Sequence, residues 1–148
     1  HPCEVHREGS RLRVASLVPR MSMEPKFVWK KNPRKGHCYT NSFQFVLANP
    51  SWKLVHGICE CTNPKKPGRM GHAWAEIVTT VKMDRFGDVE IHWVADPTRK
   101  MIFPAEIYYF VGKIDSVVRY SLDEARALVD KKNFYGPWDP TIAKANHA

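Results

Sequence analysis

The strongest helical pattern in the chain covers residues 38–48, CYTNSFQFVLA. Apolar side chains recur there at three- and four-residue intervals, and neither Pro nor Gly interrupts the run. The segment follows the Lys-, Pro- and Gly-rich residues 24–36, which read as a loop, and it ends before Asn49 and Pro50. The pattern therefore predicts a helix of about three turns that begins at Cys38.

Alternating and β-branched residues predict strands in the middle of the chain. The predicted strands are residues 52–60, 72–82, 89–95 and 105–111, and a Pro- and Gly-containing loop is predicted over 62–71. A short turn with Gly87 separates the second and third of these strands, so we expect them to pair as a hairpin.

A second helix is predicted over residues 121–132, where Ser121 and Glu124 have the spacing of a capping box. The tail 136–148 contains two prolines and is expected to be irregular. The order of elements predicts an α+β fold, in which the N-terminal helix carrying Cys38 packs on an antiparallel β-sheet.

The length of 148 residues favours one domain, which we place at residues 23–148. The chain begins with His1 rather than Met, and residues 17–20, LVPR, are similar to a protease recognition site. Residues 1–22 are therefore interpreted as an added or disordered segment outside the domain.

The chain carries 23 Lys and Arg against 15 Asp and Glu, a formal net charge of +8. This balance favours an acidic protein or peptide as substrate or partner. Nucleic acid is a possible partner, but no zinc-finger, RNP or helix-turn-helix pattern supports it. No apolar run is long enough to span a membrane, so no membrane partner is expected. Four cysteines are few for a secreted disulfide framework, which favours a reducing, cytoplasmic setting.

Three residues have the chemistry of a nucleophilic site. A thiol at a helix N-terminus, as predicted for Cys38, gains from the positive end of the helix dipole, which favours its ionised form. His72 opens one strand of the predicted hairpin and Asp96 follows the other, so the hairpin brings them to the same end. In this arrangement Asp96 would orient the imidazole of His72, which would act as the base for Cys38.

The motifs around these residues resemble the transglutaminase-like superfamily, which has papain-like Cys-His-Asp chemistry. Residues 71–76, GHAWAE, and 93–98, WVADPT, follow Cys38 in the order of that family. The segment GHCY at residues 36–39 is only a partial match to the family motif around the cysteine. The resemblance spans roughly residues 36–98 and implies a transglutaminase-like core. It also implies a thiol protease, another cysteine hydrolase or an acyltransferase that acts on amide or peptide bonds through a thioester.

Analogy with papain-like enzymes and transglutaminases suggests two oxyanion candidates, Asn32 and Trp29. Trp74 shares the strand face of His72 and is a candidate wall of the cleft, with core packing as the alternative. No cofactor and no metal are expected. The competing interpretations are an inactive fold that acts as a basic binding or inhibitor protein, and a zinc site built from Cys59, Cys61 and His56. An arylamine acetyltransferase-type enzyme would have the same triad order but usually a much longer chain.

Overall fold

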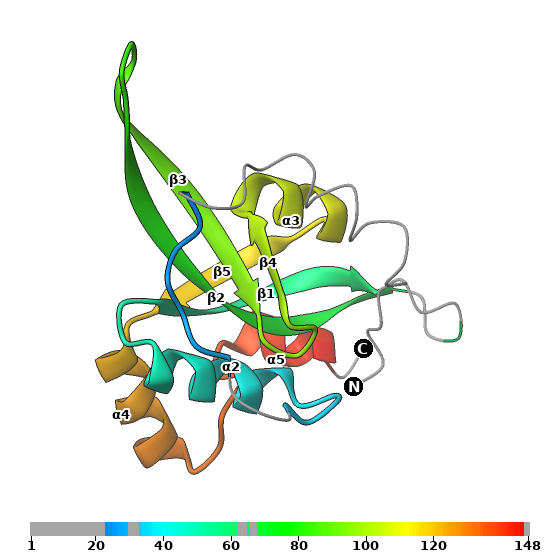
Figure 1. The fold of residues 1–148 in the computed structure, drawn as a ribbon. Helices are drawn as coiled ribbons and strands as arrows, with labels where there is room; N and C mark the ends of the chain where they lie inside the picture. Colours follow the sequence, from blue (N-terminus) through cyan, green and yellow to red (C-terminus); the bar gives the residue numbers. More distant parts are fainter. Residues whose placement is uncertain (1–22, 30–32, 62–64, 66–67, 147–148) are drawn as a thin grey trace.

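The computed structural model of the chain describes residues 23–29, 33–61, 65 and 68–146. Five strands form one antiparallel sheet in the order β4-β3-β2-β1-β5 (Figure 1). The strands are β1 Lys53–Cys61, β2 Gly68–Met83, β3 Gly87–Asp96, β4 Met101–Pro104 and β5 Asp115–Tyr120. The helices are α2 Cys38–Ala48, α3 Ala105–Gly112, α4 Leu122–Lys132 and α5 Pro140–Asn146. The predicted α+β class and the antiparallel sheet are confirmed.

Helices cover both faces of this sheet. Helices α2, α4 and α5 lie together on one face, and α3 lies on the other (Figure 1). Two apolar clusters fill the interfaces. The larger one, on the face of α2 and α4, includes Phe45, Trp52 and Trp93. The smaller one, beneath α3, includes Trp74, Val94 and Tyr108.

Helix α2 has the bounds that the sequence predicts, and its buried residues extend from Cys38 to Val46. Phe45 and Val46 are fully buried in the region of the larger cluster. At its C-terminus the side chain of Asn49 accepts from the backbone of Val28 at 2.8 Å and donates back to the same residue at 3.0 Å. This amide pair ties the loop-like segment 23–29 to the end of α2.

The predicted hairpin is confirmed, and it is longer than expected. The register of β2 and β3 runs from Ala75↔Ala95 to Met83↔Gly87. Strand β2 begins at Gly68 rather than at residue 72, so the predicted loop over 62–71 was wrong for its last residues. Pairing with β1 as far as Cys61↔Gly68 extends the strand there, which a local pattern cannot reveal.

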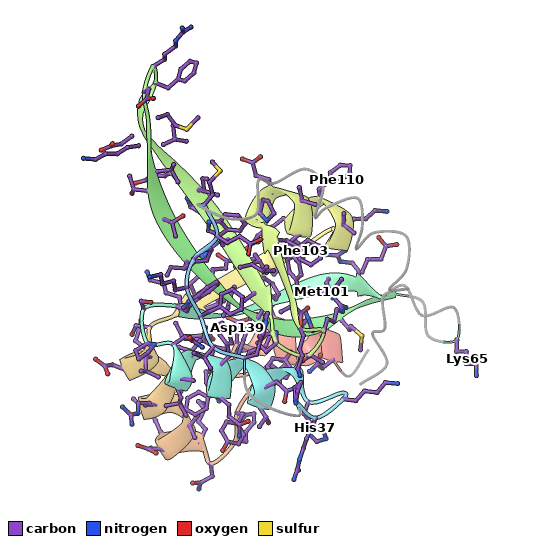
Figure 2. All side chains as sticks on the ribbon, in the orientation of Figure 1. His37, Lys65, Met101, Phe103, Phe110 and Asp139 are labelled. Atoms are coloured by element: carbon purple, nitrogen blue, oxygen red, sulfur yellow. The ribbon has the colours of Figure 1, made fainter. Side chains whose placement is uncertain are left out.

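Two other predictions are corrected. Residues 105–111 form helix α3, not a strand. Tyr108 is buried and Phe110 is exposed, whereas two residues at this spacing would share one face of a strand. Figure 2 shows Phe110 on the outer side of that helix. The tail is not wholly irregular, since Asp139 accepts from the backbone of Thr141 and Ile142 and starts α5. Strands β4 and β5 were missed because each pairs along only a few residues.

In the part of the chain that the structure describes, no helix is both long and apolar enough to cross a membrane.

Candidate active site

The thiol of Cys38 lies at the first residue of α2, where a helix leaves its backbone N–H groups without intrahelical partners. No side chain caps this end of the helix. Gly36 makes the preceding turn with a φ of 79°, which favours glycine. Cys38 is 1% exposed and packs on Tyr39 and Ala73, whereas the neighbouring His37 is exposed at the molecule's rim (Figure 2).

The imidazole of His72 lies between Cys38 and Asp96. Its Nε2 is 3.0 Å from Oδ2 of Asp96. The thiol of Cys38 lies close enough to the same imidazole to raise its pKa. The indole of Trp74 stacks on the ring, with centroids 5.9 Å apart. The structure thus brings together the three residues that the sequence proposes as catalytic, and it confirms that Trp74 shares the face of His72.

The carboxylate of Asp96 is fully buried and has three further donors besides His72. The hydroxyl of Tyr108 donates to Oδ2 at 2.8 Å. Arg99 donates through its side chain to Oδ2 at 3.2 Å and through its backbone to Oδ1 at 3.3 Å. A buried carboxylate with this many donors is held in one orientation and remains ionised.

These contacts shift the pKa values of the pair in opposite directions. Burial alone would lower the pKa of His72, but the charges and hydrogen bonds of Asp96 and Cys38 raise it to about 10. Burial would raise the pKa of Asp96, but the charge of His72, followed by Arg99 and Tyr108, holds it below its usual range. At neutral pH the pair is therefore an imidazolium and a carboxylate.

Asn41 connects the segment before the thiol to the loop after the carboxylate. Its side chain accepts from the backbone N–H of Arg34 at 3.1 Å and donates to the carbonyl of the same residue at 2.8 Å. It also donates to the hydroxyl of Thr98 at 3.1 Å. One buried amide therefore fixes the start of α2 relative to the end of β3.

Sequence patterns assigned no role to Tyr108, Arg99 or Asn41. The two donors to Asp96 lie on a short helix and in a turn whose contacts only the folded chain creates. Asn41 lies inside helix α2, so it has none of the sequence patterns that mark a helix cap. Only the threonine of the WVADPT motif, Thr98, was already part of a recognised pattern.

The three candidates for the oxyanion hole or the cleft wall lie in different environments. Trp29 is partly buried and packs against the larger apolar cluster, with its ring centroid 5.4 Å from that of Phe45, which favours a packing role. Trp74 is fully buried and packs on Tyr108, which favours the core alternative while it also covers one side of His72. Asn32 lies outside the described residues.

The zinc alternative is not supported by the strand geometry. His56 faces Tyr39 and Trp138 on one side of β1, while Cys59 faces Met70 and Ile114 on the other. The side chain of Cys61 lies outside the described region. Among the described residues, no three His, Cys, Asp or Glu side chains are grouped closely enough to hold a metal ion.

A second polar network surrounds Glu76, to which the sequence assigned no role. Trp74 donates to its Oε2 at 2.7 Å, the hydroxyl of Tyr109 donates to the same atom, and Arg119 donates to Oε1 at 2.9 Å. Since Trp74 also stacks on His72, this network fixes the indole that lies over the imidazole.

No family model, curated protein or solved structure matches this chain.

Proposed function

We propose that the chain is a cysteine-nucleophile hydrolase or acyltransferase with a transglutaminase-like core, acting on amide-type bonds. The observation that carries this proposal is the 3.0 Å contact between the imidazole of His72 and the carboxylate of Asp96, with the thiol of Cys38 near enough to raise the pKa of that imidazole. A thiol beside an imidazolium, at the positive end of a helix, is the environment in which cysteines act as nucleophiles.

In the proposed reaction, the sulfur of Cys38 attacks the acyl carbon and the C–N bond breaks. His72 carries the proton that the leaving amine requires, and the acyl group remains on sulfur as a thioester. Water or a second amine then attacks the thioester carbon, the C–S bond breaks to return Cys38 as a thiolate, and His72 receives the proton of that nucleophile. Asp96 stays ionised and keeps the ring oriented throughout.

The backbone N–H groups at the start of α2 would stabilise the oxyanion that forms during attack. Asn32 remains the proposal for a second donor. We favour hydrolysis over transfer because a domain of this size has little room for a separate acceptor site. The net charge of +8 supports the proposal of an acidic protein or peptide substrate. The small number of cysteines supports the proposal of a cytoplasmic setting.

One observation favours a second candidate function. Cys38 is 1% exposed and His72 3% exposed, so a substrate reaches the sulfur only after a neighbouring segment moves. A permanently closed site would fit a catalytically inactive fold that binds an acidic macromolecule. In that case, a Cys38→Ala variant would retain the full biological effect of the protein.

The test of the proposed function is trapping of the acyl-enzyme. The protein is mixed with p-nitrophenyl acetate, and the modified residue is mapped by mass spectrometry. We expect one acetyl group on Cys38, released by hydroxylamine, and slower acetylation in a His72→Ala variant. A Cys59→Ala variant is the matched control, since Cys59 is also a buried free thiol. Acetylation that is unchanged by Cys38→Ala would contradict the proposal.

A further inference from the structure

The β2–β3 hairpin extends well beyond the rest of the sheet as a two-stranded ribbon (Figure 1). Strand β4 pairs with β3 only from Asp96↔Met101 to Trp93↔Pro104, and the chain then turns into α3. Within the described part of the chain, no strand continues β4 along β3 from Gly87 to His92. Backbone groups on such an edge are able to pair with another chain.

A groove of about 550 Å³ opens where β4 leaves this edge. It is formed by the root of the ribbon, the start of α3 and β5. Its lining includes Glu90, His92, Pro104, Glu106 and Arg119. None of the proposed catalytic residues lines it, so the inference drawn from it is independent of the proposed function.

The groove is acidic in a chain that is basic overall. The carboxylate of Glu76 is already neutralised by Arg119, at 2.9 Å. Glu90 and Glu106, in contrast, have no ion-pair partner among the described residues. These two carboxylates can therefore form ion pairs with a cationic ligand, although the net charge of the chain is +8.

The carboxylates on and beside β3 favour some strand sequences over others at this edge. If two copies of the chain paired through β3, Asp88 and Glu90 of both copies would lie close together, and like charges across a strand pair are destabilising. A strand with Lys or Arg at alternate positions would place them all on one face, because strand side chains alternate. That face would lie over Glu90 and the groove.

We propose that the β3 edge from Gly87 to His92, together with the groove beside it, binds an extended Lys- or Arg-bearing peptide segment of a partner protein by strand addition. Main-chain hydrogen bonds to β3 supply the pairing, and the groove receives basic side chains between Glu90 and Glu106. The site selects a basic strand, whereas the net charge of the chain suggests acidic partners.

The test uses fluorescence anisotropy with a labelled peptide of alternating Lys and Thr. We expect binding that weakens with salt, and at least about threefold weaker binding to a Glu90→Gln/Glu106→Gln variant. The control is Asp123→Asn/Asp130→Asn, which removes two exposed carboxylates from α4 and should leave binding unchanged. Hydrogen exchange should show new protection in residues 88–92 when the peptide is bound.

Four outcomes would overturn the inference. One is equal binding of a peptide of alternating Glu and Thr, and another is an unchanged affinity in the Glu90→Gln/Glu106→Gln variant. Equal binding of a Lys-Thr peptide that is N-methylated at alternate amides would show charge attraction without strand addition. A concentration-dependent dimer in sedimentation, lost on Phe86→Ser/Val89→Asp substitution, would assign the ribbon to a second copy of the chain.

Discussion

His72 shows how much one residue depends on its neighbours. Burial opposes the charged form of its ring, and the charges of Asp96 and Cys38 reverse that effect. The indole of Trp74 adds a favourable contact with the cation, because its ring lies within about 6 Å. The imidazolium is thus stabilised by three side chains that the strand pairing and α2 place around it.

Direct titration of His72 by ¹⁵N-imidazole NMR checks this electrostatic account. We expect the ring to stay protonated until the pH approaches about 10. In an Asp96→Asn variant the counter-charge is lost while burial remains, so the pKa of His72 should fall below about 6.5. A wild-type ring that titrates near the ordinary histidine pKa would contradict the predicted ion pair.

His56 has the opposite environment. It is fully buried, and neither ring nitrogen has a hydrogen-bond partner among the described residues. Tyr39, Tyr120 and Trp138 pack around the ring at centroid distances of 4.8 to 5.1 Å. Burial, followed by the charge of His72, lowers the pKa of His56 to about 3.

This shift predicts a loss of stability in acid. The unfolded chain takes up a proton at His56 near pH 6.5, but the folded chain does so only near pH 3, so stability is present above pH 6.5 and falls between the two values. At about 1.4 kcal/mol per pKa unit, the effect amounts to several kcal/mol.

A His56→Leu variant tests the acid effect. Urea unfolding of this variant and the wild type at several pH values should show the free energy of unfolding of the wild type falling more steeply below pH 6.5. Parallel curves for the two proteins would show that His56 is not the group responsible.

At the scale of elements, local capping explains where α4 begins. The hydroxyl of Ser121 accepts from the backbone of Glu124 at 3.1 Å, and the carboxylate of Glu124 accepts from the backbone of Ser121 at 3.0 Å. Both bonds were predicted from two residue types at the right spacing. The signal is strong because capping depends on a short stretch of chain.

A Ser121→Ala variant should lower the free energy of unfolding by about 1 kcal/mol, measured by urea denaturation. Ser51→Ala is the control, since Ser51 lies in an exposed turn and its loss should change stability by less than about 0.5 kcal/mol. Equal effects of the two substitutions would show that the capping box does not stabilise α4.

Other elements depended on contacts that the sequence does not display. Residues 105–111 are rich in aromatic and β-branched types, which favour strands, but the chain turns at Pro104 and packs Tyr108 on the sheet as part of a helix. A tertiary contact also explains why residue 57 is glycine. A Cβ there would lie 2.6 Å from Trp74, so the indole over His72 requires glycine on the neighbouring strand.

At the scale of the molecule, the sequence predicted the α+β class, the helix that begins at Cys38 and the hairpin that joins His72 to Asp96. Each of these follows from periodicity or from a motif within a few residues. The donors Tyr108, Arg99 and Asn41 were not predictable, because they come from three separate elements and meet only after folding. The resulting site is closed, which the motifs alone did not indicate.

Rates of alkylation test the central claim, a reactive thiol held next to an imidazolium. Iodoacetamide labelling followed by mass spectrometry compares Cys38 with Cys59, which are 1% and 4% exposed and thus matched in burial. The account predicts that Cys38 is alkylated much faster near neutral pH, and that His72→Ala removes the difference. Equal rates for the two cysteines across the pH range would contradict it.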